Sequence, residues 1–275
     1  MKLNKSPLFI SGLPRSGSTL MCQLLGMHPE VYSTGHSSPL AAALKRIRSG
    51  FSEDHFMMAQ LDVDFDLGYQ RIHNAMIGFI NGWCAETDKP WVVDKNRGWL
   101  ADLDLLKTLV PDFKMLVCVR RPDQILGSIE SRHKKTALID FPDNMANMTP
   151  YQRADKLCAD QGVMGGPIQL IQAMQDQDQT TQSQLYYVVF EDLMTRPNDV
   201  MQGIYQWLGL DNHPFDAAQL PVKAHESDSY YRFKYPHKTH SQIKPPKEHQ
   251  IPARIAKEVK DKYAWFYQTF YPGAL

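Results

Sequence analysis

A short glycine-bounded loop near the start of the sequence has the composition of an anion-binding site. The apolar run that begins at Leu8 leads into the loop Gly12–Thr19, and an apolar repeat at helical spacing begins at Leu20. In a strand–loop–helix order, the N–H groups of the first helical turn and the positive end of the helix dipole face the loop. Glycine at both bounds of the turn lets the backbone approach a phosphate closely. We expect the anion to be bound by Arg15, Ser16, Gly17, Ser18 and Thr19.

The loop differs at one informative position from the ATP-binding pattern G-x-x-x-x-G-K-[ST]. Both glycines and Thr19 match, but Ser18 stands where the pattern has lysine, and the loop carries its cation at Arg15 instead. A P-loop kinase or NTPase needs that lysine on the β- and γ-phosphates, with a metal ion beside it. The loop therefore favours a donor with less charge at the transferred group. Two alternatives stay open: a P-loop kinase or NTPase with Asp94 as metal ligand, and a chance strand–turn–helix.

Further cations follow two predicted strands. Lys95 comes just after the apolar run Trp91–Val93. Arg120 follows Phe113–Val119, a near-continuous apolar run of the kind buried in parallel sheets. Ligands of such sheets lie at the carboxyl ends of the strands. One of these cations alone would indicate a surface charge, but together with Arg15 they predict an anion site at one edge of the sheet.

The elements that must position these residues alternate along the chain. Apolar runs of strand length are separated by segments with helical spacing, which predicts a parallel sheet with helices on both faces. At 275 residues the chain is long enough to bury a full core. We therefore predict an α/β, P-loop-like three-layer fold in a single domain over residues 1–275. The expected strands are Leu8–Gly12, Val31–Thr34, Trp91–Val93, Phe113–Val119 and Leu185–Phe190, and the expected helices include Leu67–Glu86, Trp99–Leu109, Pro197–Leu208 and Pro252–Phe270.

The overall composition excludes several classes of protein. Thirty basic and thirty acidic residues cancel, so no overall field favours nucleic acid or an acidic membrane. The four cysteines are scattered without C-x-x-C spacing, which indicates reduced core residues. No apolar run reaches membrane-spanning length, and Met1–Lys5 leaves no room for a signal peptide before the first strand. We expect a cytoplasmic protein that neither spans a membrane nor binds nucleic acid.

At its loop and strand ends the sequence resembles sulfotransferases that use 3′-phosphoadenylyl sulfate (PAPS). The segment Gly12–Leu20 is similar to the loop with which that family holds the 5′-phosphosulfate. Arg120, with Ser128 eight residues later, is similar to the family's 3′-phosphate site. Arg132, one helical turn beyond Ser128, matches a further cation of the tyrosylprotein sulfotransferase branch. The resemblance implies that PAPS is the donor, that adenosine 3′,5′-bisphosphate (PAP) is the product, and that no metal is required.

Later segments extend the resemblance over most of the chain. Phe190–Leu193 resembles the family's Y-E-D-L segment. Phe190 keeps the stacking ring that lies by the adenine in that family and loses the tyrosine hydroxyl. Ser241–Pro245 is similar to a C-terminal segment that covers the nucleotide, which adds Ser241 to the expected nucleotide-binding residues.

The resemblance also implies catalytic roles. In-line sulfuryl transfer needs donor and acceptor aligned and the charge on the transferred group neutralised. Lys95 is expected to contact the leaving phosphate or the sulfonyl oxygens, and Arg15 to hold the 5′-phosphosulfate. The acceptor hydroxyl loses a proton, so a base is expected. His36 stands where tyrosylprotein sulfotransferases carry a glutamate base, and histidine can serve as a base near neutral pH.

Several alternatives remain open at this point. His36 is equally well explained as a residue that orients the turn Ser37–Pro39, and Asp94 is an alternative base or a residue that orients Lys95. For the whole chain, a PAP-binding module without catalysis is a further hypothesis. The acceptor is a hydroxyl compound whose pocket we expect to be built by irregular segments around 50–66 and 134–150. The absence of an export signal favours a small molecule or a lipid.

Overall fold

The middle strand of the sheet is β1, which carries the glycine loop at its carboxyl end. The structure, a computed structural model, describes residues 1–136, 145, 147–222, 226–227, 236–237 and 239–273. Five strands pair in the order β2-β3-β1-β4-β5, and all of these pairings are parallel. Their bounds are β1 Ser6–Gly12, β2 Val31–Tyr32, β3 Trp91–Lys95, β4 Lys114–Val119 and β5 Leu185–Val189; a second sheet pairs β6 Glu226–Ser227 with β7 Pro236–His237.

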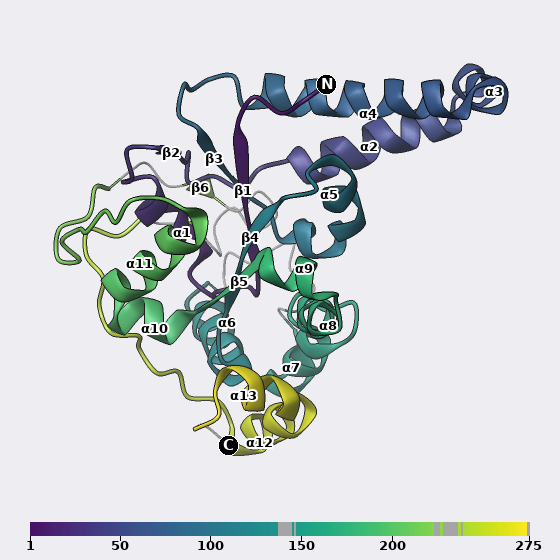
Figure 1. Cartoon of the computed structure of the whole chain (residues 1–275). Helices are drawn as coiled ribbons and strands as arrows, with labels where there is room; N and C mark the ends of the chain where they lie inside the picture. Colours follow the sequence, from purple (N-terminus) through teal and green to yellow (C-terminus); the bar gives the residue numbers. More distant parts are fainter. Residues whose placement is uncertain (137–144, 146, 223–225, 228–235, 238, 274–275) are drawn as a thin grey trace.

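Helices cover both faces of the five-stranded sheet. Their bounds are α1 Ser18–Leu25, α2 Leu40–Glu53, α3 His55–Val63, α4 Phe65–Trp83, η1 Arg97–Ala101, α5 Leu103–Leu109, α6 Pro122–Thr136, α7 Pro150–Cys158, α8 Gly165–Gln175, α9 Gln179–Ser183, α10 Phe190–Thr195, α11 Pro197–Leu208, α12 Ala253–Lys262 and α13 Ala264–Phe270. Leu8 and Ile10 of β1 belong to the apolar cluster that includes α1 and α11, whereas Phe9 belongs to the cluster that includes α5 and α8. Figure 1 shows these helix pairs on opposite sides of the strands. The predicted three-layer α/β fold with a central parallel sheet is confirmed.

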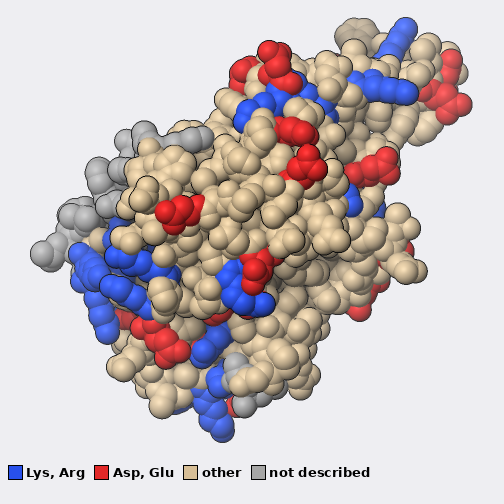
Figure 2. All heavy atoms as spheres, turned by 60° about the vertical axis from the view of Figure 1, so that its left-hand side comes forward, with Lys and Arg blue, Asp and Glu red and all other residues tan. Residues whose placement is uncertain are grey.

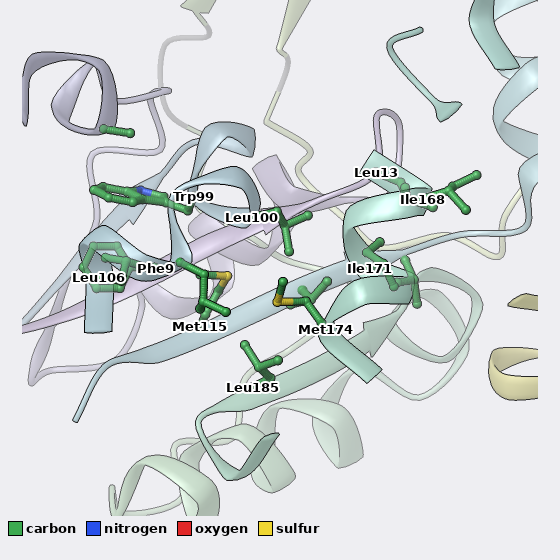
Figure 3. Close-up of a cluster of buried hydrophobic side chains, with 14 of the residues drawn as sticks. Phe9, Leu13, Trp99, Leu100, Leu106, Met115, Ile168, Ile171, Met174 and Leu185 are labelled. Carbon is green, nitrogen blue, oxygen red and sulfur yellow. The ribbon is translucent and has the colours of Figure 1, made fainter. Parts of the chain in front are cut away.

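The larger apolar cluster lies on the face of the sheet that carries Phe9. The Phe9 ring packs edge-to-face on Trp99, with ring centroids 4.6 Å apart, and both side chains are buried. Side chains from β4, α5 and α8 surround this pair (Figure 3). The indole Nε1 of Trp99 donates to Asp94 at 2.7 Å. The core therefore also fixes the residue that precedes Lys95 at the end of β3.

Helices α2, α3 and α4 form an arm that projects from the body of the molecule (Figure 1). The prediction of an irregular segment over 50–66 is wrong, because two aspartates start new helices there. The carboxylate of Asp54 accepts from the Met57 N–H at 2.8 Å, and the carboxylate of Asp64 accepts from the Leu67 N–H at 3.0 Å. Such N-cap bonds satisfy first-turn donors, so the chain resumes a helix after each break.

Two predicted helices are each divided in two. The helix expected from Trp99 consists of η1 and α5, which meet at Asp102, and the last helix consists of α12 and α13, which meet at Tyr263. Both junction residues bind a neighbouring element. The Asp102 carboxylate pairs with Lys45 of α2 at 2.7 Å, and the Tyr263 hydroxyl donates to the Cys158 carbonyl at 3.1 Å. Long-range contacts of this kind cannot be predicted from the helical spacing of apolar residues in the sequence.

Charged side chains of both signs are spread over the surface. Figure 2 shows basic and acidic groups on the body and on the arm, in keeping with the equal totals of the two kinds. Within the ranges given above, no helix is both long enough and apolar enough to cross a membrane. The segment 134–150, expected beside the acceptor, lies partly outside the described residues.

The tightest backbone approach in the sheet gives a stability prediction. Gly12 has φ +124°, and a Cβ there would lie 2.1 Å from the carbonyl oxygen of Cys118 on β4. We predict that Gly12→Ala lowers the free energy of unfolding by about 3 kcal/mol or more, because the dihedral is strained and the two strands must separate. Urea denaturation followed by circular dichroism measures the change.

Gly50→Ala in α2 is the matched control. No atom of the described residues lies within 4 Å of a Cβ added at Gly50, so alanine should stabilise that helix by about 0.5–1 kcal/mol. Equal effects of the two substitutions would contradict the close approach at Gly12.

Candidate active site

The loop after β1 turns through conformations that are unusual for residues with side chains. The φ angle is +59° at Arg15 and +89° at Gly17. Hydrogen bonds hold the first half of the loop: the Leu13 N–H donates to the Cys118 carbonyl at 2.9 Å, and Ser16 Oγ donates to the Leu13 carbonyl at 2.6 Å. Ser16 is buried. The Ser16 side chain therefore stabilises the fold of the loop, whereas Arg15 is exposed on the loop surface.

Helix α1 begins directly behind this loop. It starts at Ser18 after Gly17 and has no side-chain N-cap hydrogen bond. The N–H groups of a first turn lie outside the helix's own hydrogen bonds, and with the helix dipole they form an anion-binding position. Ser18 and Thr19, both half-buried, belong to this turn. The residues predicted to bind an anion, 15–19, thus surround one helix N-terminus.

Arg15, Arg120 and Ser128 lie together and form what we call the arginine cluster. Arg120 Nη1 donates to the main-chain carbonyl of Arg15 at 3.0 Å, and Arg15 Nε lies 3.4 Å from Ser128 Oγ. Arg120 follows β4, the neighbour of β1, and Ser128 is on α6. Arg132 stands one turn further along the same side of α6. The pairing of β1 with β4 therefore joins the residues that were predicted for two separate phosphates.

Arg120 is buried without a full set of hydrogen bonds. Its exposed fraction is 6%, and its Nε has no hydrogen-bond partner in the part of the chain that the structure describes. Burial lowers the pKa of Arg120, and nearby Arg15 lowers it further, while Glu191 acts in the opposite direction. An unsatisfied buried donor is costly. An anionic oxygen beside Arg120 would remove that cost.

Phe190 packs between the loop and Arg120. The guanidinium carbon of Arg120 lies 4.2 Å from the centroid of the Phe190 ring, a cation–π contact. A Cβ at Gly17 would lie 2.9 Å from the same ring, so glycine lets the ring approach the loop backbone. The structure therefore places Phe190 among the predicted nucleotide-binding residues.

Carboxylates and tyrosines that sequence reasoning missed flank the arginine cluster. The Tyr267 hydroxyl donates to Asp123 at 2.6 Å, and the Tyr271 hydroxyl donates to Glu191 at 2.8 Å. Against the effect of burial, hydrogen bonds from Tyr267 and its other neighbours hold the pKa of Asp123 below its ordinary value. The helical spacing of the two tyrosines is a weak signal for this pairing, since it shows a shared face but not its partner.

Lys95 lies on the other side of β1, next to the loop that carries His36. In the sheet Lys95 is paired with Ile10. Its Nζ, on a side chain that is almost fully buried, donates to the Gly35 carbonyl at 3.0 Å. The Ser38 N–H donates to the Lys95 carbonyl at 2.9 Å. These bonds fasten the loop to the end of β3 and keep the exposed His36 beside Lys95.

Asp94 supports this loop from the opposite face of the sheet. Successive side chains of a strand alternate, so Asp94 and Lys95 point to different sides of β3. The Asp94 carboxylate accepts from Trp99 Nε1 at 2.7 Å and is hydrogen-bonded to Ser38. Burial raises the pKa of Asp94 to about 6. These contacts favour a role in holding Ser38, and with it His36, over the predicted role of orienting Lys95.

The C-terminal segment contacts helices α1 and α6. Ser241 follows His240, whose N–H and carbonyl both hydrogen-bond to the buried side chain of Gln23 on α1. Further along, the His249 N–H donates to Gln124 Oε1 of α6 at 2.9 Å. Sequence reasoning selected Ser241 and missed His249, because the contact with α6 is long-range and has no local pattern.

The sequence is similar to those of known sulfotransferases. Protein-tyrosine sulfotransferase A of Caenorhabditis elegans is 30% identical over 156 residues, which cover 56% of this chain and 40% of the relative. Protein-tyrosine sulfotransferase 2 of Gallus gallus is 26% identical over 205 residues, which cover 74% of this chain and 51% of the relative. The chain thus spans about half the length of the curated relatives it matches.

Solved sulfotransferase structures share the fold. A sulfotransferase from Alicyclobacillus acidocaldarius superposes with a TM-score of 0.57 at 13% identity, over 98% of this chain and 95% of that chain. The sulfotransferase domain from the curacin biosynthetic pathway gives 0.55 at 17% identity, over 96% and 99%. The sequence model of the Sulfotransferase family matches residues 7–214, from the second residue of β1 to beyond α11. Because this match contains the loop, Lys95 and the arginine cluster, the chain belongs to the Sulfotransferase family.

Proposed function

We propose that this chain transfers the sulfuryl group of PAPS in line to a hydroxyl acceptor, without a metal, in a single domain over residues 1–275. The observation that carries the proposal is the buried Nε of Arg120 without a partner in the described part of the chain. A 3′-phosphate beside Arg120 supplies the missing acceptor, and Ser128 and Arg132 bind its other oxygens. This phosphate is also what distinguishes PAPS from ATP.

The remaining residues of the site have separate roles in nucleotide binding and in the reaction. Arg15 and the N–H groups of 16–19 hold the 5′-phosphosulfate, and Phe190 and Ser241 complete the nucleotide contacts. Lys95 neutralises charge on the leaving phosphate or the sulfonyl oxygens. A fixed cation stabilises such charge most strongly when water is excluded from the site. His36 takes the proton of the acceptor hydroxyl as its oxygen bonds to sulfur and the bond from sulfur to the phosphate oxygen breaks, which releases PAP.

The proposed acceptor is a hydroxyl of a small molecule or a lipid. A tyrosyl hydroxyl of a protein is the second candidate, because the curated relatives are named for that substrate. All four cysteines are buried and none forms a disulfide, which supports a reducing compartment, and we propose the cytoplasm. Ser18 at the lysine position of the ATP-binding pattern argues against a P-loop kinase.

Ligand preference tests the donor. We expect PAP to bind more tightly than ADP with Mg²⁺ by about tenfold or more, because ADP lacks the group that satisfies Arg120. Isothermal titration calorimetry with both ligands measures the ratio. Equal or tighter binding of ADP with Mg²⁺ would contradict the proposal and favour the P-loop kinase.

Lys95→Ala tests whether the chain is a catalyst or a PAP-binding module. Removal of one preorganised donor should lower turnover by about 10²–10³, with a smaller effect on PAP affinity. The assay follows PAP release from PAPS in the presence of hydroxyl acceptors. Lys114→Ala is the matched control, since Lys114 begins β4 at the opposite end of the sheet and lies over the Trp207 ring. A loss of turnover of less than tenfold in Lys95→Ala would contradict the catalytic role of Lys95.

The turnover of His36→Ala tests His36 as the base. Removal of the group that takes the acceptor's proton should lower turnover by about 10²–10⁴. Asp94→Asn should lower turnover less, because Asp94 acts through Ser38; PAP release from PAPS in the presence of hydroxyl acceptors measures both variants. A loss below tenfold in His36→Ala would leave His36 as a residue that orients the turn.

A further inference from the structure

The chain segment before α12 is fastened to α6 beside the arginine cluster. The His249 N–H donates to Gln124 Oε1 at 2.9 Å, and Gln124 Nε2 donates to the His249 carbonyl at 3.3 Å. Gln124 is buried and lies one turn before Ser128 on α6. Because both main-chain groups of His249 bond to one fixed side chain, the backbone of His249 holds a defined position relative to Ser128.

Gly127 provides the space for this contact. A Cβ at Gly127 would lie 2.4 Å from the Cβ of His249 and 3.3 Å from Cγ2 of Ile251. Any side chain at this position would push the segment off α6. Gly127 directly precedes Ser128. The Cβ of His249 therefore lies next to the residues that we assign to the 3′-phosphate.

His249 stands in the field of cations from several elements. Those that act on its imidazole come from the loop, the end of β4, α6 and its own segment, namely Arg15, Arg120, Lys135 and Lys247. The carboxylate of neighbouring Glu248 lies 3.9 Å from Arg121, which also pairs with Asp123 at 2.9 Å. Partial burial and the cations, Arg120 first among them, lower the pKa of His249. The imidazole is therefore neutral near neutral pH in the free protein.

We infer that His249 is a further ligand of the 3′-phosphate and takes up a proton when that phosphate binds. This inference rests on the proposed function, because it requires a nucleotide with a 3′-phosphate. A phosphate dianion beside Arg120 offsets the cations that disfavour imidazolium, and it accepts a charge-assisted hydrogen bond from the protonated ring. The pKa of His249 then rises on binding. If PAP binding adds a proton to His249, PAP binds more tightly as the pH is lowered from above the pKa of His249 in the complex towards its pKa in the free protein.

Calorimetric titration in buffers of different ionisation enthalpy counts the protons taken up per ligand. With PAP at about pH 7.5, we expect the wild-type chain to take up a measurable fraction of a proton and His249→Asn almost none. The variant should also bind PAP about tenfold more weakly, the loss expected for one charge-assisted hydrogen bond. At this pH a phosphate monoester is already a dianion, so its own titration contributes little.

Two controls isolate the 3′-phosphate. His55→Asn, exposed on the arm, should match the wild type in proton uptake and PAP affinity. Adenosine 5′-phosphate, which lacks the 3′-phosphate, should bind equally to the wild type and to His249→Asn. His249→Gln repeats the test with a second neutral side chain, and thermal unfolding shows which variants are folded.

The outcomes separate the two proposals. Equal proton uptake by the wild type and by a folded His249 variant overturns the inference and leaves PAP binding intact. A wild-type chain that fails to bind PAP overturns the proposed function itself. A difference in affinity between the wild type and His249→Asn that persists with adenosine 5′-phosphate also overturns the inference, because it would place His249 at another part of the nucleotide.

Discussion

The hydrogen bond from Arg120 to the main-chain carbonyl of Arg15 fixes the distance between the two anion positions that we propose for the site. It can form because β1 and β4 run parallel and end at the same edge, with Gly12 pressed against Cys118. The proposed anion positions at the start of α1 and beside Arg120 therefore have a set separation in the free protein. A ligand with two phosphates at that separation would avoid the cost of assembling the site.

Placing guanidinium groups side by side has an electrostatic cost, and the last helix of the chain helps to offset it. Glu191 attracts Arg120, and burial raises the pKa of Glu191, so this carboxylate itself needs support. The Tyr271 hydroxyl supplies it at 2.8 Å, and Tyr267 does the same for Asp123. The region around α13 thus supports the arginine cluster, whose residues all come from much earlier in the sequence.

The sheet and its strand-end cations could be predicted from the sequence because both depend on local pattern. A run such as Phe113–Val119 has few alternatives to a buried strand, and parallel strands bring Lys95 and Arg120 to one edge. The arm could be predicted only in part. The helix expected over Leu67–Glu86 is α4, but α3 could not be predicted, since it starts at the Asp54 cap within an apolar segment that has no clear period. Likewise, the contact of His249 with α6 depends on one glycine and one glutamine more than a hundred residues away, as the sequence separation of 125 between Gln124 and His249 shows.

Adjacent residues of β3 contact opposite faces of the sheet, and this arrangement links Lys95 and His36, the proposed catalytic pair. Lys95 enters the site, while Asp94 enters the core and holds Ser38. Ser38 also donates to the Lys95 carbonyl, and its side chain accepts from the N–H of Leu40, where α2 begins. The arm is therefore joined to the body directly behind a residue that is anchored to β3. Because Ser38 lies between His36 and α2 in the sequence, its hydrogen bonds to β3 tie the position of the His36 loop to the strand.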